Sequence, residues 1–408
     1  MTGFTLAPIG VLLMVACLIA MLTRRLGLPY IVGLVVAGFL IALLPEGPNL
    51  PLSRELIFNI FLPPLVFEAA LQLDWRRFRA ELPLTLTLAF LGVAIAAAIV
   101  AAGMHWLVGW SWIGAALFGV LIAATDPVSV IASFREMGCQ PRVSMVVESE
   151  SLLNDGVAAV GFAILSAIAA GASPTAANVI PAFIWTLGGG LIIGLGVSAA
   201  ILIIVGRTDD PLVEITLTTI AAYASFLIAE HFDASGIISA LAAGLLIGSA
   251  GTRFLSRAGH DRVNSAWEYF AFLANSFVFI LIGMSVANQP LHRLGSAAAA
   301  IAIVLVLAGR GLSVYPLAAA FRWSRWRING AFQHTLFWGG LRGALALALA
   351  LAVPVTVAER DAIILTAFVV VAFSILAQGL TMPWLIKRLK LGRRAPQEAA
   401  VAAQPTHP

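Results

Sequence analysis

Six ionisable side chains stand inside otherwise apolar stretches of this sequence: Glu68, Asp126, Glu150, Asp155, Arg310 and Arg342. An unpaired charge at the centre of a lipid bilayer costs at least ~2.5–3.5 kcal/mol. Charged groups that are kept at such a cost usually bind ions, transfer protons or pair with one another. These six residues are therefore the candidate functional residues of the chain.

Asp155 is the residue that we expect to bind a transported ion. In "ESLLNDG" (150–156), Ser151 and Asp155 are four residues apart and share one face of a helix, whereas Asn154 points about 100° away from Asp155. A carboxyl group among apolar atoms binds a proton more readily than one in water, so a proton and a monovalent cation can compete for it. Such a group would be a minimal exchanger. The alternative is a buried aspartate that only hydrogen-bonds another helix.

The stretch "ATDPVSV" (124–130) places Asp126 next to a helix breaker. Pro127 donates no backbone hydrogen bond and disturbs the carbonyl one turn earlier, so carbonyls from Ala123 to Thr125 are free to face a cavity and bind a hard cation. Asp126 is expected either to cap the half-helix that follows Pro127 or to contact the cation directly.

The other intramembrane charges and oxygens complete the site. Ser151, the carbonyl or hydroxyl of Thr125, and Glu68 can add ligands to an all-oxygen shell that suits sodium or lithium. Glu68 has a second interpretation, as a charge that lines the cytoplasmic side and attracts cations. Glu150 needs an opposite charge, and Arg342 is predicted to form a buried structural ion pair with it. Arg310 is expected to neutralise a carboxylate or a half-helix C-terminus.

The composition indicates an all-α polytopic membrane protein, because 61% of the 408 residues are hydrophobic and 11% are charged. Thirteen apolar runs are candidate transmembrane helices, near 5–22, 29–44, 56–73, 82–108, 111–134, 143–170, 179–205, 212–231, 235–250, 266–287, 296–320, 330–352 and 361–386. The start of the chain reads as a retained helix and not as a signal peptide.

The placement of arginine supports this count. The loops after odd-numbered runs and the tail hold most of the Lys and Arg residues, whereas those after even-numbered runs hold only Arg54, Arg293 and Arg360. The bias predicts an N-terminus outside and a C-terminus in the cytoplasm, in the cell (inner) membrane. Residues 1–390 are expected to form one transmembrane unit, followed by a short disordered tail, 391–408.

The fifth and twelfth runs share interruptions, at Thr125–Pro127 and in "FWGGLRGAL" (337–345). Each is the middle of a triplet of runs, and with the predicted topology the two triplets run in opposite senses. Inverted repeats with two crossed discontinuous helices are typical of a transporter fold.

Five motifs in family order resemble the monovalent cation:proton antiporters of the NhaP/NHE type (sodium/hydrogen exchangers): "FLPPLVFEAA" (61–70), "ATDPVSV" (124–130), "ESLLNDG" (150–156), "GRGLSVYP" (309–316) and "GGLRGAL" (339–345). The resemblance implies an NhaA-like fold of thirteen helices. It implies a core domain with helices near 82–170 and 296–386, a dimerisation domain from the remaining helices, and a homodimer that works by an elevator-like movement.

The same resemblance implies roles for individual residues. Asp155 matches the ion-binding carboxylate, Ser151, Glu68 and Thr125 match further cation ligands, and Asn154 and Asp126 match supporting residues of the crossed-helix site. Glu150 and Arg342 match the family's buried ion pair. The Asn154-Asp155 pair looks like the electroneutral type, which exchanges one sodium or lithium ion for one proton in pH and sodium homeostasis.

Three alternatives remain. A potassium/proton antiporter of the same fold would use the same oxygens. A cation channel is less favoured, because the sequence lacks a Thr-Val-Gly-Tyr-Gly filter motif. An intramembrane aspartyl protease would use Asp126 and Asp155, but Leu-Asn precedes the second aspartate where those proteases carry Gly-x-Gly. We expect no enzyme activity and no cofactor. We also expect no nucleic-acid partner, because the basic residues are scattered over short loops.

Overall fold

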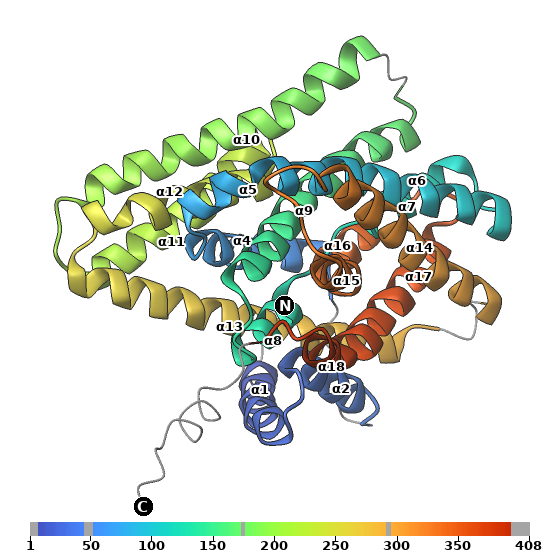
Figure 1. Cartoon of the computed structure of the whole chain (residues 1–408), viewed down its shortest axis with the longest axis horizontal. Helices are drawn as coiled ribbons and strands as arrows, with labels where there is room; N and C mark the ends of the chain where they lie inside the picture. The colour runs from blue at the N-terminus through green and yellow to red at the C-terminus, as the bar shows by residue number, and fades with distance from the viewer. Residues whose placement is uncertain (1–6, 45–51, 173–175, 291–294, 393–408) are drawn as a thin grey trace, which may run out of the picture.

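A computed structural model describes residues 7–44, 52–172, 176–290 and 295–392 of the chain (Figure 1). Helices joined by short loops make up nearly all of these residues. In chain order the helices are α1 (Ala7–Leu26), α2 (Tyr30–Ala42), α3 (Arg54–Leu56), α4 (Leu62–Leu71), α5 (Trp75–Thr87), α6 (Val93–Gly103), α7 (Trp112–Leu121), α8 (Val128–Glu136), α9 (Pro141–Ala169), α10 (Ala176–Val205), α11 (Pro211–His231), α12 (Gly236–Phe254), α13 (Arg257–Asn288), α14 (Ser296–Ala320), α15 (Gly330–Trp338), α16 (Ala344–Leu351), α17 (Arg360–Phe373) and α18 (Leu380–Arg388).

Short π-helical stretches join or extend several of these helices. Ile57–Phe61 joins α3 to α4, Leu88–Gly92 joins α5 to α6, Met104–Val108 extends α6, and Ser374–Gly379 joins α17 to α18. The long rods α5–α6 and α17–α18 are therefore continuous helices with a local widening.

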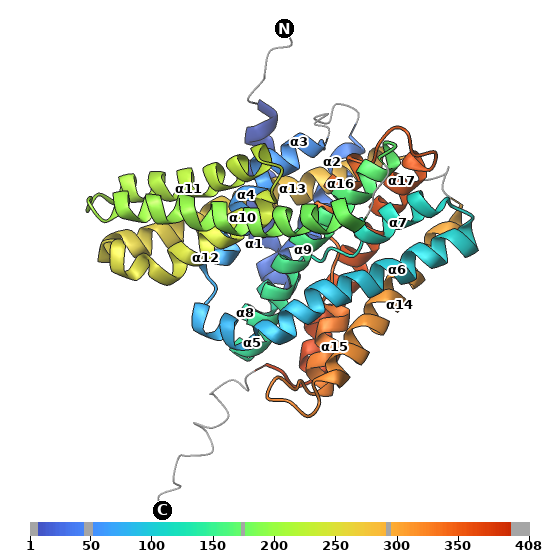
Figure 2. The same cartoon turned by 90° about the horizontal axis from the view of Figure 1, so that it is seen from above.

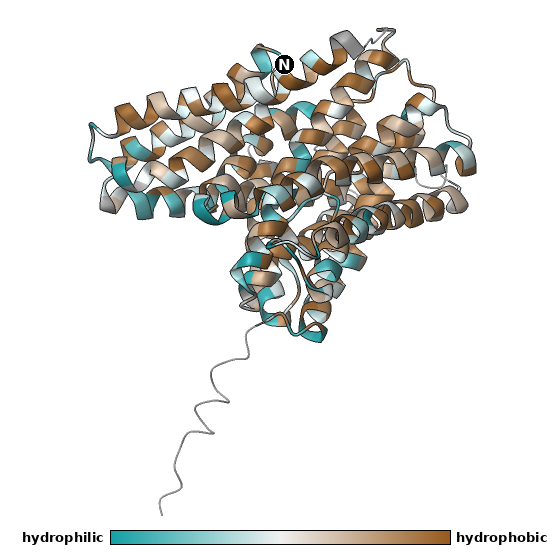
Figure 3. Cartoon of the chain, turned by 45° about the horizontal axis from the view of Figure 1, so that its top comes forward, coloured by the Kyte–Doolittle hydropathy of each residue, from teal (hydrophilic) through white to brown (hydrophobic). Residues whose placement is uncertain are grey.

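Within the described residues, eight helices are long and apolar enough to cross a membrane, and shorter apolar helices stand beside them. The chain is thus a multi-pass membrane protein. Each of the thirteen predicted runs coincides with helix, although the fifth and twelfth are each split into two short helices. Figure 3 shows apolar residues along most of the length of the helices, and polar residues mainly at helix ends and loops.

α5 and α13 begin well before their apolar runs, which start at 82 and 266. α5 begins at Trp75, where the Asp74 side chain accepts hydrogen bonds from the backbone N–H groups of Arg76 and Arg77. α13 begins at Arg257, and the hydroxyl of Ser256 accepts from the N–H of Gly259. These caps carry each helix into polar sequence that hydropathy alone does not assign to a span.

Glycines allow the closest helix contacts. A Cβ atom at Gly283 of α13 would lie 2.1 Å from the carbonyl oxygen of Val35, and one at Gly38 of α2 would lie 2.0 Å from that of Ile280. A side chain at either position would push the two backbones apart. α2 therefore packs along α13 at a distance that only glycine permits.

The helices form two groups with α9 between them, as Figures 1 and 2 show from two directions. In one group α12 packs against α4, α10 and α11, and α13 packs against α2. In the other, α6 packs against α7 and α14, and α16 packs against α17. The second group holds both interrupted helices.

The two interruptions meet in the interior. The backbone N–H of Asp126, between α7 and α8, donates a 2.8 Å hydrogen bond to the carbonyl of Leu341, between α15 and α16. These two residues form an isolated antiparallel bridge. Four short helices thus end or begin around one point.

Candidate functional site

Asp126 lies at the N-termini of two half-helices. Its Oδ1 accepts a 2.9 Å hydrogen bond from the N–H of Val128 in the first turn of α8. Its Oδ2 lies against Gly343, the N-cap of α16, where a Cβ atom would stand 2.1 Å from that oxygen. A carboxylate at this place is stabilised by the positive ends of both helix dipoles. The geometry is that of the predicted half-helix cap.

Asn154 of α9 holds the first interruption in place. Its Oδ1 accepts a 3.1 Å hydrogen bond from the N–H of Thr125, and its Nδ2 donates to the Thr125 hydroxyl at 2.6 Å and to Oε1 of Glu150 at 3.1 Å. The hydroxyl of Ser151 lies 3.0 Å from the same Thr125 hydroxyl. All four side chains are at most 1% exposed. One amide thus satisfies a backbone group that the helix break has freed.

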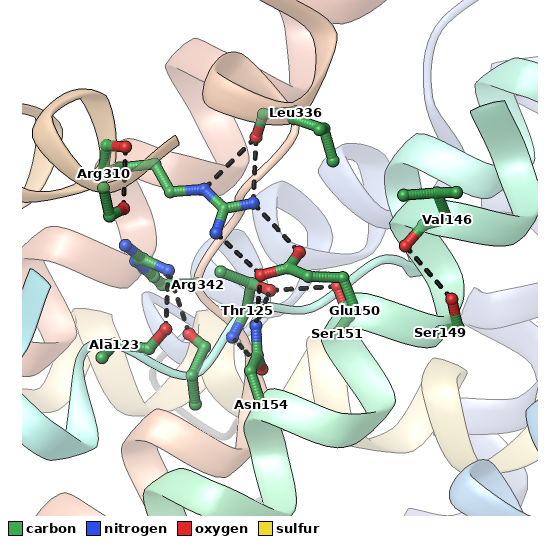
Figure 4. Close-up of polar contacts among 12 residues, drawn as sticks. Ala123, Thr125, Val146, Ser149, Glu150, Ser151, Asn154, Arg310, Leu336 and Arg342 are labelled. Atoms are coloured by element: carbon green, nitrogen blue, oxygen red, sulfur yellow. Dashed lines mark hydrogen bonds and ion pairs between the residues drawn. The ribbon is translucent and has the colours of Figure 1, made fainter. Parts of the chain in front are cut away.

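Glu150 pairs with Arg310 of α14, as Figure 4 shows. The guanidinium donates to both carboxylate oxygens, at 2.8 and 3.0 Å, and also to the carbonyl of Leu336 in the last turn of α15. The predicted pair between Glu150 and Arg342 is therefore wrong. Arg310 fills both roles expected for it, as the partner of a carboxylate and at a half-helix C-terminus.

Arg342 points instead at the end of the other half-helix (Figure 4). Its Nη1 donates to the carbonyls of Ala123 and Ala124, at 3.1 and 3.2 Å, just beyond α7. A cation here compensates the negative end of that helix. The same contacts occupy two of the three carbonyls that we expected to bind a cation, and they leave the carbonyl of Thr125.

The second interruption is anchored to the helix rod behind it. The hydroxyl of Ser374 accepts a 2.8 Å hydrogen bond from the N–H of Arg342 and donates to Gln378. The Gln378 amide donates to the carbonyl of Trp338 at 3.2 Å. The break between α15 and α16 is thus held from the π-helical stretch of the α17–α18 rod.

Asp155 faces a cavity of about 70 Å³. Thr125, Asp126, Asn275 and the start of α16 line this cavity together with Asp155. None of the hydrogen bonds among the described residues involves the Asp155 carboxylate. The carboxylate is therefore free to bind a ligand in the cavity, and the other lining residues include further oxygen atoms.

Glu68 lies in a second, neighbouring cavity of about 330 Å³. The lining of that cavity includes Glu148, Glu268 and Arg135, and it shares Pro127 and Asn275, among others, with the first cavity. The two cavities therefore adjoin. The amide of Gln72 bridges Glu68 to Arg135 through one hydrogen bond to each.

The residues predicted for the site fall into two shells. Thr125, Asp126, Pro127 and Asp155 line one cavity, whereas Ser151 reaches it only through its contact with Thr125. Glu68 is not among the residues that line the Asp155 cavity. Ser151 and Glu68, two of the predicted cation ligands, thus do not line the cavity that Asp155 faces.

Sequence reasoning missed three residues that the structure brings to these cavities. Glu148 carried a usable signal, because it stands seven residues before Asp155 and so lies on the same face of α9 two turns away. Gly343 was part of a quoted motif, but its contact with Asp126 joins separate helices. Asn275 is a single amide in the apolar run of α13 and gave no signal of its own.

Comparisons with known proteins identify the family of this chain. The family model described as "Sodium/hydrogen exchanger, transmembrane" matches residues 11–388. The Na⁺/H⁺ antiporter NhaS2 of Synechocystis sp. is 37% identical over 96% of this chain and 72% of its own length. The Na⁺/H⁺ antiporter ApNhaP of Aphanothece halophytica is 38% identical over 90% of this chain and 71% of its own.

A solved structure supports the fold. That of the sodium proton antiporter MjNhaP1 from Methanocaldococcus jannaschii at pH 8 superposes with a TM-score of 0.73 at 19% sequence identity, and covers 94% of this chain and 98% of that one. The matched residues include both helix interruptions and all six intramembrane charges. The chain belongs to the sodium/hydrogen exchanger family.

Proposed function

We propose that this protein exchanges sodium or lithium for protons across the membrane, and that Asp155 binds the two ions in alternation. The observation that carries the proposal is the position of Asp155, on a cavity at the meeting point of two interrupted helices and without a hydrogen bond from the described residues. The family consists of transporters and not of enzymes, which removes the protease alternative.

The buried charges favour one proton per cation. Around the interruptions, Glu150 and Arg310 neutralise each other. In the same cluster, the positive charge of Arg342 balances the negative charge of Asp126. Asp155 then adds one negative charge. Either one proton or one monovalent cation makes the cluster neutral, so a site that crosses only when it is neutral performs electroneutral exchange.

The cation would be held by oxygens. The Asp155 carboxylate, the carbonyl of Thr125, the Asp126 carboxylate and the amide oxygen of Asn275 are available around the cavity. Hard ligands of this kind suit sodium or lithium. A volume of about 70 Å³ has room for a cation with a few of its waters. We propose that Ser151 orients Thr125, and that Glu68 attracts cations in the outer cavity.

The outer cavity gives this site its access route. Arg135 follows one of the predicted cytoplasmic ends, so we propose that the cavity of Glu68 opens towards the cytoplasm. Closing this cavity and opening a path on the opposite side of the membrane would be alternating access.

We further propose thirteen membrane crossings with inverted repeats, and an N-terminus outside the inner membrane. The group with α6, α9 and α14 would be the moving core, and that with α12 and α13 the dimerisation domain of a homodimer.

Ion fluxes in proteoliposomes test the proposal. Internal pH is followed with a dye after sodium, lithium or potassium is added to the native protein and to Asp155→Asn. We expect sodium and lithium to dissipate an imposed pH gradient only with the native protein. If potassium alone dissipates the pH gradient, the transported cation is potassium and not sodium. Sodium entry without proton movement would indicate a channel.

A further inference from the structure

A long apolar cavity separates α5 from the pair α10 and α12, outside the ion site. Its volume is about 600 Å³, and among the described residues Ser249 contributes the one hydroxyl group in its lining. α5 and the π-helical stretch after it contribute Trp75, Phe78, Leu82, Leu86 and Phe90. Residues 75–90 of a helix span roughly 22 Å, more than half of the ~30 Å hydrocarbon thickness of a bilayer.

Several residues that line the cavity are exposed at the protein surface. Leu86 and Leu191, which line it, are 39% and 46% exposed. At the far end, the ring of Phe90 contacts that of Phe183 edge to face, with centroids 6.4 Å apart. At the other end Trp75 is 41% exposed. A tryptophan at such a mouth is typical of the membrane–water boundary.

Two arginines stand at that mouth on different helices. Arg79 lies four residues after Trp75 and three before Leu82, and so on the α5 face that lines the cavity. Arg253 lies one turn beyond Ser249 on the lining face of α12. Both side chains are exposed and neither forms an ion pair among the described residues. The apolar slot therefore ends beside two arginines that form no ion pair among the described residues.

We propose that this cavity binds one anionic phospholipid of the bilayer, with an acyl chain between α5 and the α10–α12 pair and the headgroup phosphate between Arg79 and Arg253. The apolar lining matches the chain, the length is enough for the roughly 15 Å hydrocarbon depth of one leaflet, and the two arginines match the charge. The lipid would lie between the two groups of helices, where it would affect any movement of one against the other.

Two kinds of substitution test the site without touching the ion cavity. Gly188 of α10 lines the apolar cavity, and a Cβ atom there meets nothing within 4 Å. Gly188→Leu therefore adds a side chain to the slot with no clash at its Cβ atom. Gly196→Leu is the matched control, because Gly196 lies on the same helix, has equal space and is not among the lining residues. Arg79→Gln with Arg253→Gln removes the charges, and Arg325→Gln controls for the loss of a surface charge elsewhere.

The measurement is native mass spectrometry of the protein purified from membranes and then exchanged into detergent with equal phosphatidylglycerol and phosphatidylethanolamine. We expect the native protein and both controls to retain one phosphatidylglycerol per chain. Loss of the two arginines should weaken that preference by about fivefold per charge, and Gly188→Leu should reduce total retained lipid by roughly tenfold or more.

Two outcomes would overturn the proposal. One is equal retention of the two lipids by the native protein. The other is unchanged lipid retention in Gly188→Leu. Because the arginine variant leaves the helix packing intact, it tests whether the two arginines bind the headgroup phosphate even if Gly188→Leu is poorly folded.

Discussion

Breaking the Glu150–Arg310 pair should destabilise the protein far more than breaking an ion pair at its surface. Glu150 is 1% exposed, and its carboxylate accepts two hydrogen bonds from Arg310 and one from Asn154. Glu150→Gln keeps the shape but leaves the Arg310 guanidinium, 7% exposed, without a counter-charge. Such a loss costs about 3–5 kcal/mol, which lowers the melting temperature by roughly 5–10 °C in a chain of this size.

The assay is thermal melting of the purified protein in detergent, followed by fluorescence-detected size exclusion. Glu81→Gln provides the matched control, because its pair with Arg142 has the same 2.8 Å distance but a half-exposed arginine. Its loss should cost about 1 kcal/mol or less. Glu150→Gln combined with Arg310→Gln should melt above either single variant, because no buried charge is left alone.

Two results would refute this reasoning. If Glu150→Gln melts like Glu81→Gln, the buried pair does not stabilise the fold. If Glu150→Gln is rescued by Arg342→Gln and not by Arg310→Gln, the carboxylate pairs with Arg342 after all.

Three further predictions concern the helix ends. Gly343→Ala should abolish cation-driven proton flux in proteoliposomes, because the new Cβ would stand 2.1 Å from the Asp126 carboxylate; flux like that of the native protein would contradict the contact. Asn154→Ala should lower the melting temperature more than Ser151→Ala, because it leaves the Thr125 N–H unpaired at a cost of about 1–3 kcal/mol; equal losses would count against this role. Burial raises the pKa of Glu359, but hydrogen bonds from the Ser111 N–H and hydroxyl outweigh it and hold that pKa below its ordinary value. The tie between α7 and α17 should therefore stabilise the fold above about pH 4.5 and be lost as pH falls through the lowered pKa; Glu359→Gln should lack that pH dependence in melting curves.

The sequence predicts the helices and the two helix interruptions well, because both depend on local patterns. Hydropathy finds the spans, and Pro127 with its neighbouring aspartate marks one interruption. The spacing of Asn154 and Asp155 on one helix correctly separates the residue that faces the first interruption from the one that faces the cavity.

The partner of Glu150 could not be predicted in the same way. Arg310 and Arg342 both stand beside glycines in apolar runs, and nothing local distinguishes them. The choice depends on how α14 and the α15–α16 break are placed against α9. In the fold, Arg342 is turned towards the carbonyls after α7, and Arg310 reaches both Glu150 and the end of α15. Asp233 and Lys390 adopt positive φ angles, and the sequence around these two residues does not indicate this either.

Competition of sodium and protons for one carboxylate, Asp155, is the centre of the proposed mechanism. It is tested most directly by measuring sodium binding and proton release together, by titration of the unbuffered purified protein between about pH 6 and 9. We expect one proton to be released per sodium ion bound where Asp155 is protonated, with an apparent sodium Kd that rises about tenfold per unit fall in pH, and neither signal in Asp155→Asn. Sodium binding without proton release, or unchanged binding in Asp155→Asn, would contradict this mechanism.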